Sequence, residues 1–364
     1  MSSICEQTTG LDDQHFWRLM SARIAGQRVP FSGSLALTHR CNLGCVHCYA
    51  GEKPGGDITR SELGTGQWLK IIADIKVAGC LFLLLTGGEP LLRDDFSEIY
   101  SFARKSGFLV TVFTNGTLVS DRIIGLFQDL PPRLVEISLY GANAETHDRI
   151  TGIPGSFDRA LQGIEALLSA GMQVRLKSVL MTLNNEGFPA IEELARSRGI
   201  KFRFDPAIFP TLAGDRGPLD LRVAPERAVD LEMADADRVR EWREFFRSFR
   251  EDPGGDGLFN CGSGVNTFHV DPQGQLFPCL MVRNASYSLS SGRFQDGWGQ
   301  AFNDFRKAVP EAHAPCRGCE KKLLCGYCPG FFEMENGADL TPSEYMCGIG
   351  KRRFEKIVSE APGG

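Results

Sequence analysis

The sequence lacks the features that direct a chain to export, to a membrane or to nucleic acid. Its beginning, MSSICEQTTGLDDQHFW, has no basic stretch followed by an apolar one, so we expect no secretory signal. No apolar run approaches the length of a membrane span. The formal net charge is −5, unlike that of a nucleic-acid-binding surface. We therefore expect a cytoplasmic protein with neither a membrane nor a nucleic-acid partner.

Repeats and low-complexity tracts are also missing, and the composition is that of a folded protein. Apolar residues make up 42% and charged residues 23% of the chain, which argues against disorder. A length of 364 residues exceeds one ordinary hydrophobic core. We therefore expect one large domain or two unequal ones.

Cysteine, by contrast, is abundant, with 12 residues in the chain. In a long chain without an export signal, clustered cysteines favour metal binding or catalysis over disulfides. Cys41, Cys45 and Cys48 form one cluster, and seven more lie between residues 261 and 347. Cys80 opens the apolar run CLFLLLT and is predicted to be a small buried residue. Cys5 stands alone in the N-terminal segment.

Short apolar, β-branched runs alternate with amphipathic helical stretches between residues 34 and 206. The expected strands are Ser34–Thr38, Leu81–Thr86, Leu109–Thr114, Leu134–Tyr140, Gln173–Met181 and Ile200–Asp205. This alternation predicts parallel strands with right-handed crossovers. Six β–α units fall short of the eight in a closed barrel, so an incomplete barrel and an open doubly wound sheet both fit.

The composition changes after the sixth expected strand. Pro, Gly and Asp are frequent over residues 207–225, and an amphipathic helical stretch around Trp242 and Phe246 follows. Two short strands, Thr267–Val270 and Gln275–Pro278, are expected around a DPQG turn. We predict an N-terminal segment (1–33), a β–α domain (34–215), a helical linker (216–257) and a cysteine-rich domain (258–364).

The first cysteine cluster, LTHRCNLGCVHCYA, follows the first expected strand. In barrel-like α/β folds this edge of the sheet carries the chemistry. Three soft thiolates at CxxxCxxC spacing suit an iron–sulfur cubane and leave one iron open for a ligand. The alternative is a structural zinc ion with His39 or His47 as fourth ligand.

This cysteine loop, placed after the first strand of a β–α series, resembles the radical S-adenosylmethionine (SAM) superfamily. The resemblance implies a partial (β/α)6 TIM-like barrel in which Cys41, Cys45 and Cys48 hold a 4Fe–4S cluster. The open iron would bind the methionine part of SAM, and reduction would split SAM to a 5′-deoxyadenosyl radical. The resemblance also implies that His47 and Tyr49, on either side of the third cysteine, contribute to the cofactor site.

Two strand ends support this resemblance. TGGEP ends the second strand and is similar to the family's GGEP element, which implies that Gly87, Gly88, Glu89 and Pro90 meet the SAM ammonium. FTNGT ends the third strand, where Asn115 is either part of the cofactor site or of a simple Asn-Gly turn.

Two later segments carry further candidate SAM contacts. ISLYG resembles the family's S-x-D-G ribose element, with Ser138 retained and Tyr140 in place of the usual acid. Arg149 matches a position that pairs with the SAM carboxylate, although an exposed helix arginine would also explain it. Lys177, on the fifth strand, faces either the cavity or the opposite side of the sheet.

The C-terminal cysteines resemble the SPASM extension of radical SAM enzymes. They are Cys261, Cys279, Cys316, Cys319, Cys325, Cys328 and Cys347, and a pair of zinc ribbons is the alternative. The resemblance implies two auxiliary 4Fe–4S clusters, one held by Cys316, Cys319, Cys325 and Cys347 and a nearer one by Cys261, Cys279 and Cys328. The nearer cluster lacks an eighth cysteine, so His269, Asp271, water or the substrate would complete it.

The resemblance favours an oxidoreductase that takes hydrogen from a ribosomally made peptide, with crosslinking or another oxidation as the result. An external electron donor such as flavodoxin or ferredoxin is implied. About thirty residues precede the first strand, too few for a leader-binding domain, so we expect a separate protein to present any leader. The alternatives are a small-molecule dehydrogenase of the aminocyclitol or tetrapyrrole type and a non-enzymatic iron–sulfur or zinc protein.

Overall fold

The computed structural model of the chain describes residues 27–50, 62–251, 257–307 and 314–359. Most of the predicted N-terminal segment, with Cys5, lies outside these residues. The strands are β1 (Ser32–Ala36), β2 (Phe82–Thr86), β3 (Leu109–Thr114), β4 (Leu134–Ser138), β5 (Val174–Val179), β6 (Lys201–Asp205), β7 (Thr267–Val270), β8 (Gln275–Phe277) and β9 (Tyr287–Ser288). All six predicted strands of the β–α series are confirmed, most of them one or two residues shorter than expected at an end.

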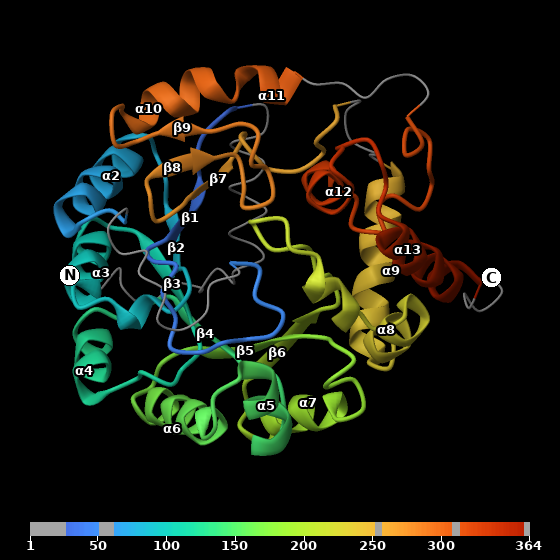
Figure 1. Cartoon of the computed structure of the whole chain (residues 1–364), viewed down its shortest axis with the longest axis horizontal. Coiled ribbons are helices and arrows are strands. Elements are labelled where there is room, and N and C mark those ends of the chain that lie inside the picture. Colours follow the sequence, from blue (N-terminus) through green and yellow to red (C-terminus); the bar gives the residue numbers. More distant parts are fainter. Residues whose placement is uncertain (1–26, 51–61, 252–256, 308–313, 360–364) are drawn as a thin grey trace, which may run out of the picture.

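The helices fall into two groups along the chain (Figure 1). The first group is α2 (Thr65–Val77), α3 (Phe96–Lys105), α4 (Asp121–Asp129), α5 (Ala144–Thr151), α6 (Ser156–Ser169) and α7 (Phe188–Ser197). The second is α8 (Pro225–Glu232), α9 (Ala236–Glu251), α10 (Phe294–Asp296), α11 (Asn303–Lys307), α12 (Pro329–Asn336) and α13 (Glu344–Phe354). The helices of the first group lie around the outside of the parallel strands.

The strand order identifies the architecture. The described strands form one sheet in the order β6-β5-β4-β3-β2-β1-β7-β8-β9, and β1 to β6 are parallel. Each of these six strands lies beside its predecessor in sequence, whereas a doubly wound sheet reverses direction at a switch point. The fold is therefore the incomplete barrel, and the open doubly wound alternative is wrong.

Alternation along the strands separates the two faces of this sheet. Val110, Val112, Leu176 and their neighbours at every second position pack in one core with helix residues such as Trp68 and Phe96. The intervening residues of each strand face the barrel interior. Cys80 is buried, as predicted, and its thiol donates to the carbonyl of Phe82 at 3.3 Å.

The cysteine-rich region is continuous with the barrel sheet. β7 pairs in parallel with β1, with Ser34 opposite His269, and β8 and β9 follow in antiparallel order. The sheet thus runs through the predicted boundary at residue 258, although the domain limits themselves stay a prediction. Gly33 permits this pairing, because a Cβ there would lie 2.0 Å from the Phe268 ring.

A buried ion pair joins α13 to α8. Arg353 of α13 donates to both carboxylate oxygens of Glu232 of α8, at 2.7 and 3.0 Å, and to the carbonyl of Leu324. Its guanidinium lies 4.3 Å from the centre of the Trp242 ring. The predicted apolar stripe of α9 is buried only in part, since Phe246 is in the core whereas Phe245 is 38% exposed.

We expect Arg353→Met to lower the free energy of unfolding by about 3–5 kcal/mol, because it leaves the Glu232 carboxylate buried and unpaired. The matched control is Arg352→Met, one residue earlier, since Arg352 pairs with Asp230 at the exposed surface. Arg352→Met should lower the free energy of unfolding by about 1 kcal/mol or less. Urea unfolding of the metal-loaded protein measures both. Equal losses in the two variants would contradict the role of the buried pair.

Candidate active site

The first three cysteines lie together after β1, at the carboxyl edge of the parallel strands. Burial raises the pKa of the Cys41 thiol to about 11, and the Cys48 thiol adds to this shift. Burial also raises the pKa of Cys45, followed by the charges of Cys48 and Cys41. In the described ranges no group of three or more His, Cys, Asp or Glu side chains is arranged to hold a metal ion. The three thiols nevertheless lie within electrostatic reach of one another, because the pKa shifts of Cys41 and Cys45 include the charges of neighbouring cysteines.

Gly87 and Gly88 hold the β2 loop against the start of the cysteine loop. A Cβ on Gly87 would lie 2.3 Å from the Thr38 carbonyl oxygen, and one on Gly88 would lie 2.3 Å from that of Arg40. The amides of Gly88 and Glu89 donate to these two carbonyls at 2.7 and 2.9 Å. Gly87 also has φ 140°, which favours glycine. Both glycines are thus required by backbone contact, and their contact with SAM stays a prediction.

Glu89 connects the ends of β2 and β3. Its buried carboxylate accepts hydrogen bonds from the amides of Leu91 (3.0 Å) and Asn115 (2.7 Å) and from the Thr114 hydroxyl (2.8 Å). Burial raises its pKa to about 7. Pro90 follows as the first residue of a short 3-10 turn that ends at Leu92. These bonds fix the position of Asn115.

Asn115 touches the first cysteine, so FTNGT is more than a simple turn. Its amide nitrogen lies 3.8 Å from Cys41 Sγ and donates to Asn42 Oδ1 at 2.9 Å. Its side-chain Oδ1 accepts from the Thr117 backbone amide at 2.9 Å. An amide donor beside a thiolate ligand tunes the electronics of a metal centre. The contribution of Asn42 had no signal in the sequence.

Three aromatic rings pack together beside the cysteine loop, with His47 edge-on to Tyr140 and His147 stacked on it. The Tyr140 ring lies 4.6 Å from His47 and 5.8 Å from His147 of α5, centre to centre. The Tyr140 amide donates to His147 Nδ1 at 3.2 Å. Burial raises the pKa of the Tyr140 phenol, with a further contribution from the Cys45 charge, and a hydrogen bond to Ser138 lowers it. The tyrosine that replaces the expected acid therefore lies near the thiols.

His47 offers an unsatisfied polar atom at this site. Its Nδ1 is buried without a hydrogen-bond partner in the part of the chain that the structure describes. Burial lowers the pKa of its imidazole to about 4, so the ring is neutral at pH 7. A neutral ring with a free buried nitrogen fits a ligand that brings both a flat surface and a hydrogen-bonding group, as adenine does.

Two further predicted SAM contacts make other contacts, although Tyr49 stays near the thiols, since the Cys48 charge adds to burial in raising the pKa of its phenol. The Tyr49 ring packs at 5.6 Å from Phe209, in the segment after β6. Arg149 is exposed in the last turn of α5 and donates to the Leu183 carbonyl at 2.9 Å. Its position matches the alternative of an exposed helix arginine, and its pairing with SAM stays a prediction.

The C-terminal cysteines form two groups. Burial raises the pKa of Cys328 to about 11, with contributions from Cys279 and Cys261. The Ser263 hydroxyl lies 3.3 Å from Cys261 Sγ and also bonds Cys279. Ser263 is thus the polar side chain between these two thiols. The sequence gives no signal for this contact.

The other group surrounds Cys325. Burial raises its pKa to about 12, followed by the charges of Cys347, Cys316 and Cys319. The Tyr327 phenol lies near both groups, because its pKa is raised to about 12 by burial and then by charges that include Cys316 and Cys328. The assignment of these two groups to two cluster ligand sets stays a prediction.

His269 and Asp271 are engaged by groups other than these cysteines. His269 Nδ1 lies 2.7 Å from the Ser34 hydroxyl on β1. The Asp271 carboxylate accepts from the amides of Gln273 and Gln275 at 3.1 and 2.8 Å and faces Arg283. The identity of a fourth ligand for the nearer set stays a prediction.

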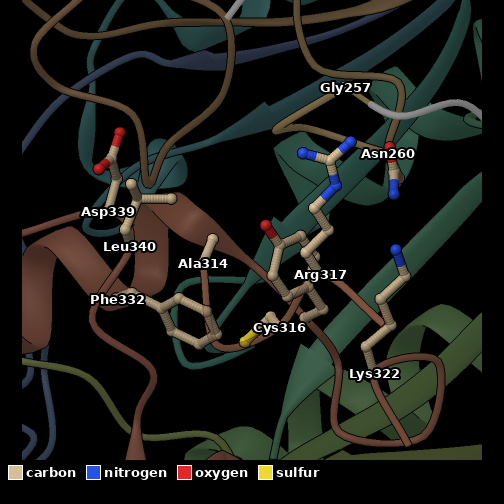
Figure 2. A pocket seen from close by; sticks show the side chains of 10 residues that line it. Gly257, Asn260, Ala314, Cys316, Arg317, Lys322, Phe332, Asp339 and Leu340 are labelled. Atoms are coloured by element: carbon tan, nitrogen blue, oxygen red, sulfur yellow. The ribbon is translucent and has the colours of Figure 1, made fainter. Parts of the chain in front are cut away.

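A pocket lies over Cys316 (Figure 2). It encloses about 450 Å³, part of it open to solvent. Figure 2 shows Arg317 and Lys322 on one side of Cys316 and Asp339 on the other. Tyr327 also lines this pocket. Cys316 is therefore reached from outside through this pocket.

Known proteins are similar to this chain in sequence and fold. The sequence model of the radical SAM superfamily matches residues 35–197. The mycofactocin maturase MftC of Mycolicibacterium smegmatis is 31% identical over 314 residues, which cover 83% of this chain and 78% of that protein. The AdoMet-dependent heme synthase of Methanosarcina barkeri is 29% identical over 324 residues, covering 80% and 89%.

Solved structures share the fold at low identity. Native anSMEcpe with bound AdoMet has a TM-score of 0.71 and 17% identity and covers 91% of this chain and 97% of that chain. Streptococcus suis SuiB has a TM-score of 0.69 and 14% identity and covers 91% and 80%. The sequence and the fold thus define one class of protein, the radical SAM enzymes. This chain belongs to the radical SAM superfamily.

Proposed function

We propose that the protein is a radical SAM oxidoreductase that modifies a ribosomally made peptide. The observation that carries the proposal is the meeting of Cys41, Cys45 and Cys48 at the carboxyl edge of the barrel, with Asn115 against the first thiol. When bound there, the cluster and SAM supply a reductive C–S cleavage and a carbon radical for hydrogen abstraction.

The residues of the chain have separate tasks in this proposal. The three thiols hold the cluster, and Asn115 orients and polarises Cys41. His47 and Ser138 are the side chains that best fit the adenosine part of SAM, since both lie against Tyr140 beside the cysteine loop. Gly87, Gly88 and Glu89 fix the loop that carries the first thiol.

Two auxiliary clusters complete the cofactor set. The Cys316 group has four thiols and closes a cubane by itself, whereas Cys261, Cys279 and Cys328 supply three. Ser263, held between two of these three thiols, supports the nearer cluster. The pocket over Cys316 gives a flavodoxin or ferredoxin a route to the four-thiol cluster.

The peptide substrate rests on the relatives. MftC, named a maturase, is 31% identical to this chain over 314 residues, which cover 83% of it. SuiB has been solved with the precursor peptide SuiA. No helix in the described residues is long and apolar enough to cross a membrane. A cytoplasmic location, where such peptides are made, is part of the proposal.

A tetrapyrrole is the second candidate substrate. The heme synthase of Methanosarcina barkeri aligns over 89% of its length, and an Fe-coproporphyrin III synthase from the same organism is 36% identical over 165 residues. Both names point to an iron porphyrin as the product.

An anaerobic assay separates the two candidates. The reduced enzyme is given SAM and either a short peptide encoded beside its gene or iron-coproporphyrin III. We expect 5′-deoxyadenosine to form in step with a peptide that has lost the mass of two hydrogens, because radical abstraction followed by oxidation removes two. Porphyrin conversion with an unchanged peptide would reverse the assignment. The Cys41→Ala enzyme is the control for both arms.

A further inference from the structure

Three cations meet one buried carboxylate inside the barrel. Glu136 of β4 accepts a hydrogen bond from Arg203 Nε at 3.0 Å and a second from the same guanidinium. Arg175 Nη1 lies 3.8 Å and Lys177 Nζ 4.0 Å from its oxygens. One carboxylate balances only one of these three charges.

The three cations face the interior and remain accessible. Val174 and Leu176 of β5 pack in the core under the helices, so Arg175 and Lys177 project from the opposite face. The exposed side-chain fractions are 36% for Arg175, 25% for Lys177 and 49% for Arg203. A molecule inside the barrel can therefore reach each of them.

The strand register places two of these cations beside the cofactor residues. Ser138 is opposite Lys177, and Lys177 is opposite Arg203. The Lys177 ammonium lies 3.5 Å from the centre of the Phe113 ring, two residues before Asn115. The row Ser138–Lys177–Arg203 thus begins at a predicted SAM contact and extends away from it.

Lys177 keeps its donors free. Its ammonium makes no hydrogen bond to any residue that the structure describes, and burial lowers its pKa to about 8 against the opposing charge of Glu136. The neighbouring acids are occupied or directed elsewhere. Glu89 accepts three hydrogen bonds from its own loops, and Asp205 of β6 accepts from the Ala207 amide and faces Arg353 as well as Arg203.

We propose that Lys177 and Arg203 bind a carboxylate of the substrate inside the barrel, beside the SAM site. Glu136 takes two of the Arg203 donors, so the remaining guanidinium N–H groups and the Lys177 ammonium are the donors that can each meet one oxygen of a carboxylate. Glu136 and Phe113 position the two cations. The inference rests on the proposed function and names a chemical feature of its substrate. A peptide carboxylate and a porphyrin propionate share this chemistry.

The test is anaerobic equilibrium binding to the metal-loaded enzyme with SAM. One arm uses short random peptides and the same peptides with every carboxylate methyl-esterified, measured by ultrafiltration and mass spectrometry. The other uses iron-coproporphyrin III and its tetramethyl ester, measured by absorbance. We expect the free acids to bind about tenfold or more tightly than the esters in at least one arm. The arm that shows the preference identifies the source of the carboxylate.

Variants connect the preference to the two cations. Lys177→Gln and Arg203→Gln should each lower the ratio of acid to ester affinity severalfold. The double variant should bring this ratio close to one. Lys177→Arg keeps the charge and should retain the preference. The matched control is Arg196→Gln, because Arg196 pairs with Glu193 on the exposed side of α7.

SAM cleavage without substrate, measured in parallel, separates this inference from the proposed function. A wild-type enzyme that cleaves SAM but binds acids and esters equally would overturn the inference alone. Absence of cleavage in the wild-type enzyme would instead defeat the proposed function. If Lys177→Gln keeps its iron but loses SAM cleavage, Lys177 serves SAM and not the substrate, and the inference is wrong.

Discussion

Replacing Cys41, Cys45 or Cys48 with Ala should reduce the formation of 5′-deoxyadenosine from SAM to background. Each thiol supplies one of three bonds that hold the cluster, and the structure places all three within mutual electrostatic reach. Loss of an outer-shell partner of a metal ligand alone costs 10–100-fold. We therefore expect a decrease of more than about a hundredfold for loss of a ligand. Chromatography of anaerobic, dithionite-reduced reactions measures the product.

Cys80→Ala is the matched control for this series. Cys80 is buried on the barrel sheet, and its thiol contacts the carbonyl of Phe82 rather than the cysteine loop. This variant should keep its iron and its SAM cleavage. Normal cleavage by any of the three loop variants would contradict the assignment of the cluster to this loop.

Local patterns predicted the strands, but they did not predict which strands are neighbours. The run Leu109–Thr114 was predicted to the residue, because its alternation and its flanking turns are both local signals. The choice between an incomplete barrel and a doubly wound sheet depends on crossovers, which periodicity does not encode. The parallel pairing of β7 with β1 joins residues more than two hundred positions apart and had no signal in either strand.

The candidate site shows the same division between features that local patterns predict and contacts that only the structure reveals. Spacing identified the cysteines, and the structure adds the partners that position them. Asn42 and His147 are ordinary polar residues in the sequence, and only the structure reveals their contacts with Asn115 and Tyr140. Lys177 could face either side of β5, and only the packing of Leu176 under the helices settles that it faces inward.

The second large effect that we expect is on metal content. The reconstituted wild-type protein should carry about twelve irons, from three cubanes. The Cys261→Ala, Cys279→Ala, Cys328→Ala triple variant should lose about four of them, because these thiols form one group in the structure. Replacement of Cys316, Cys319, Cys325 and Cys347 should remove a different set of about four irons. Iron and zinc analysis of anaerobic protein, with EPR of the reduced clusters, measures each loss.

The same measurement decides between clusters and zinc ribbons in the C-terminal region. Two zincs and about four irons in the wild-type protein would show that only the Cys41 loop holds a cubane. Under our assignment both C-terminal variants keep some SAM cleavage, since the thiols of the SAM site are separate from both groups. Both should lose substrate turnover, because electrons or the substrate can no longer use the missing cluster. Loss of all iron in either variant would mean that the cysteine groups do not bind metal independently, and would contradict the three-site arrangement.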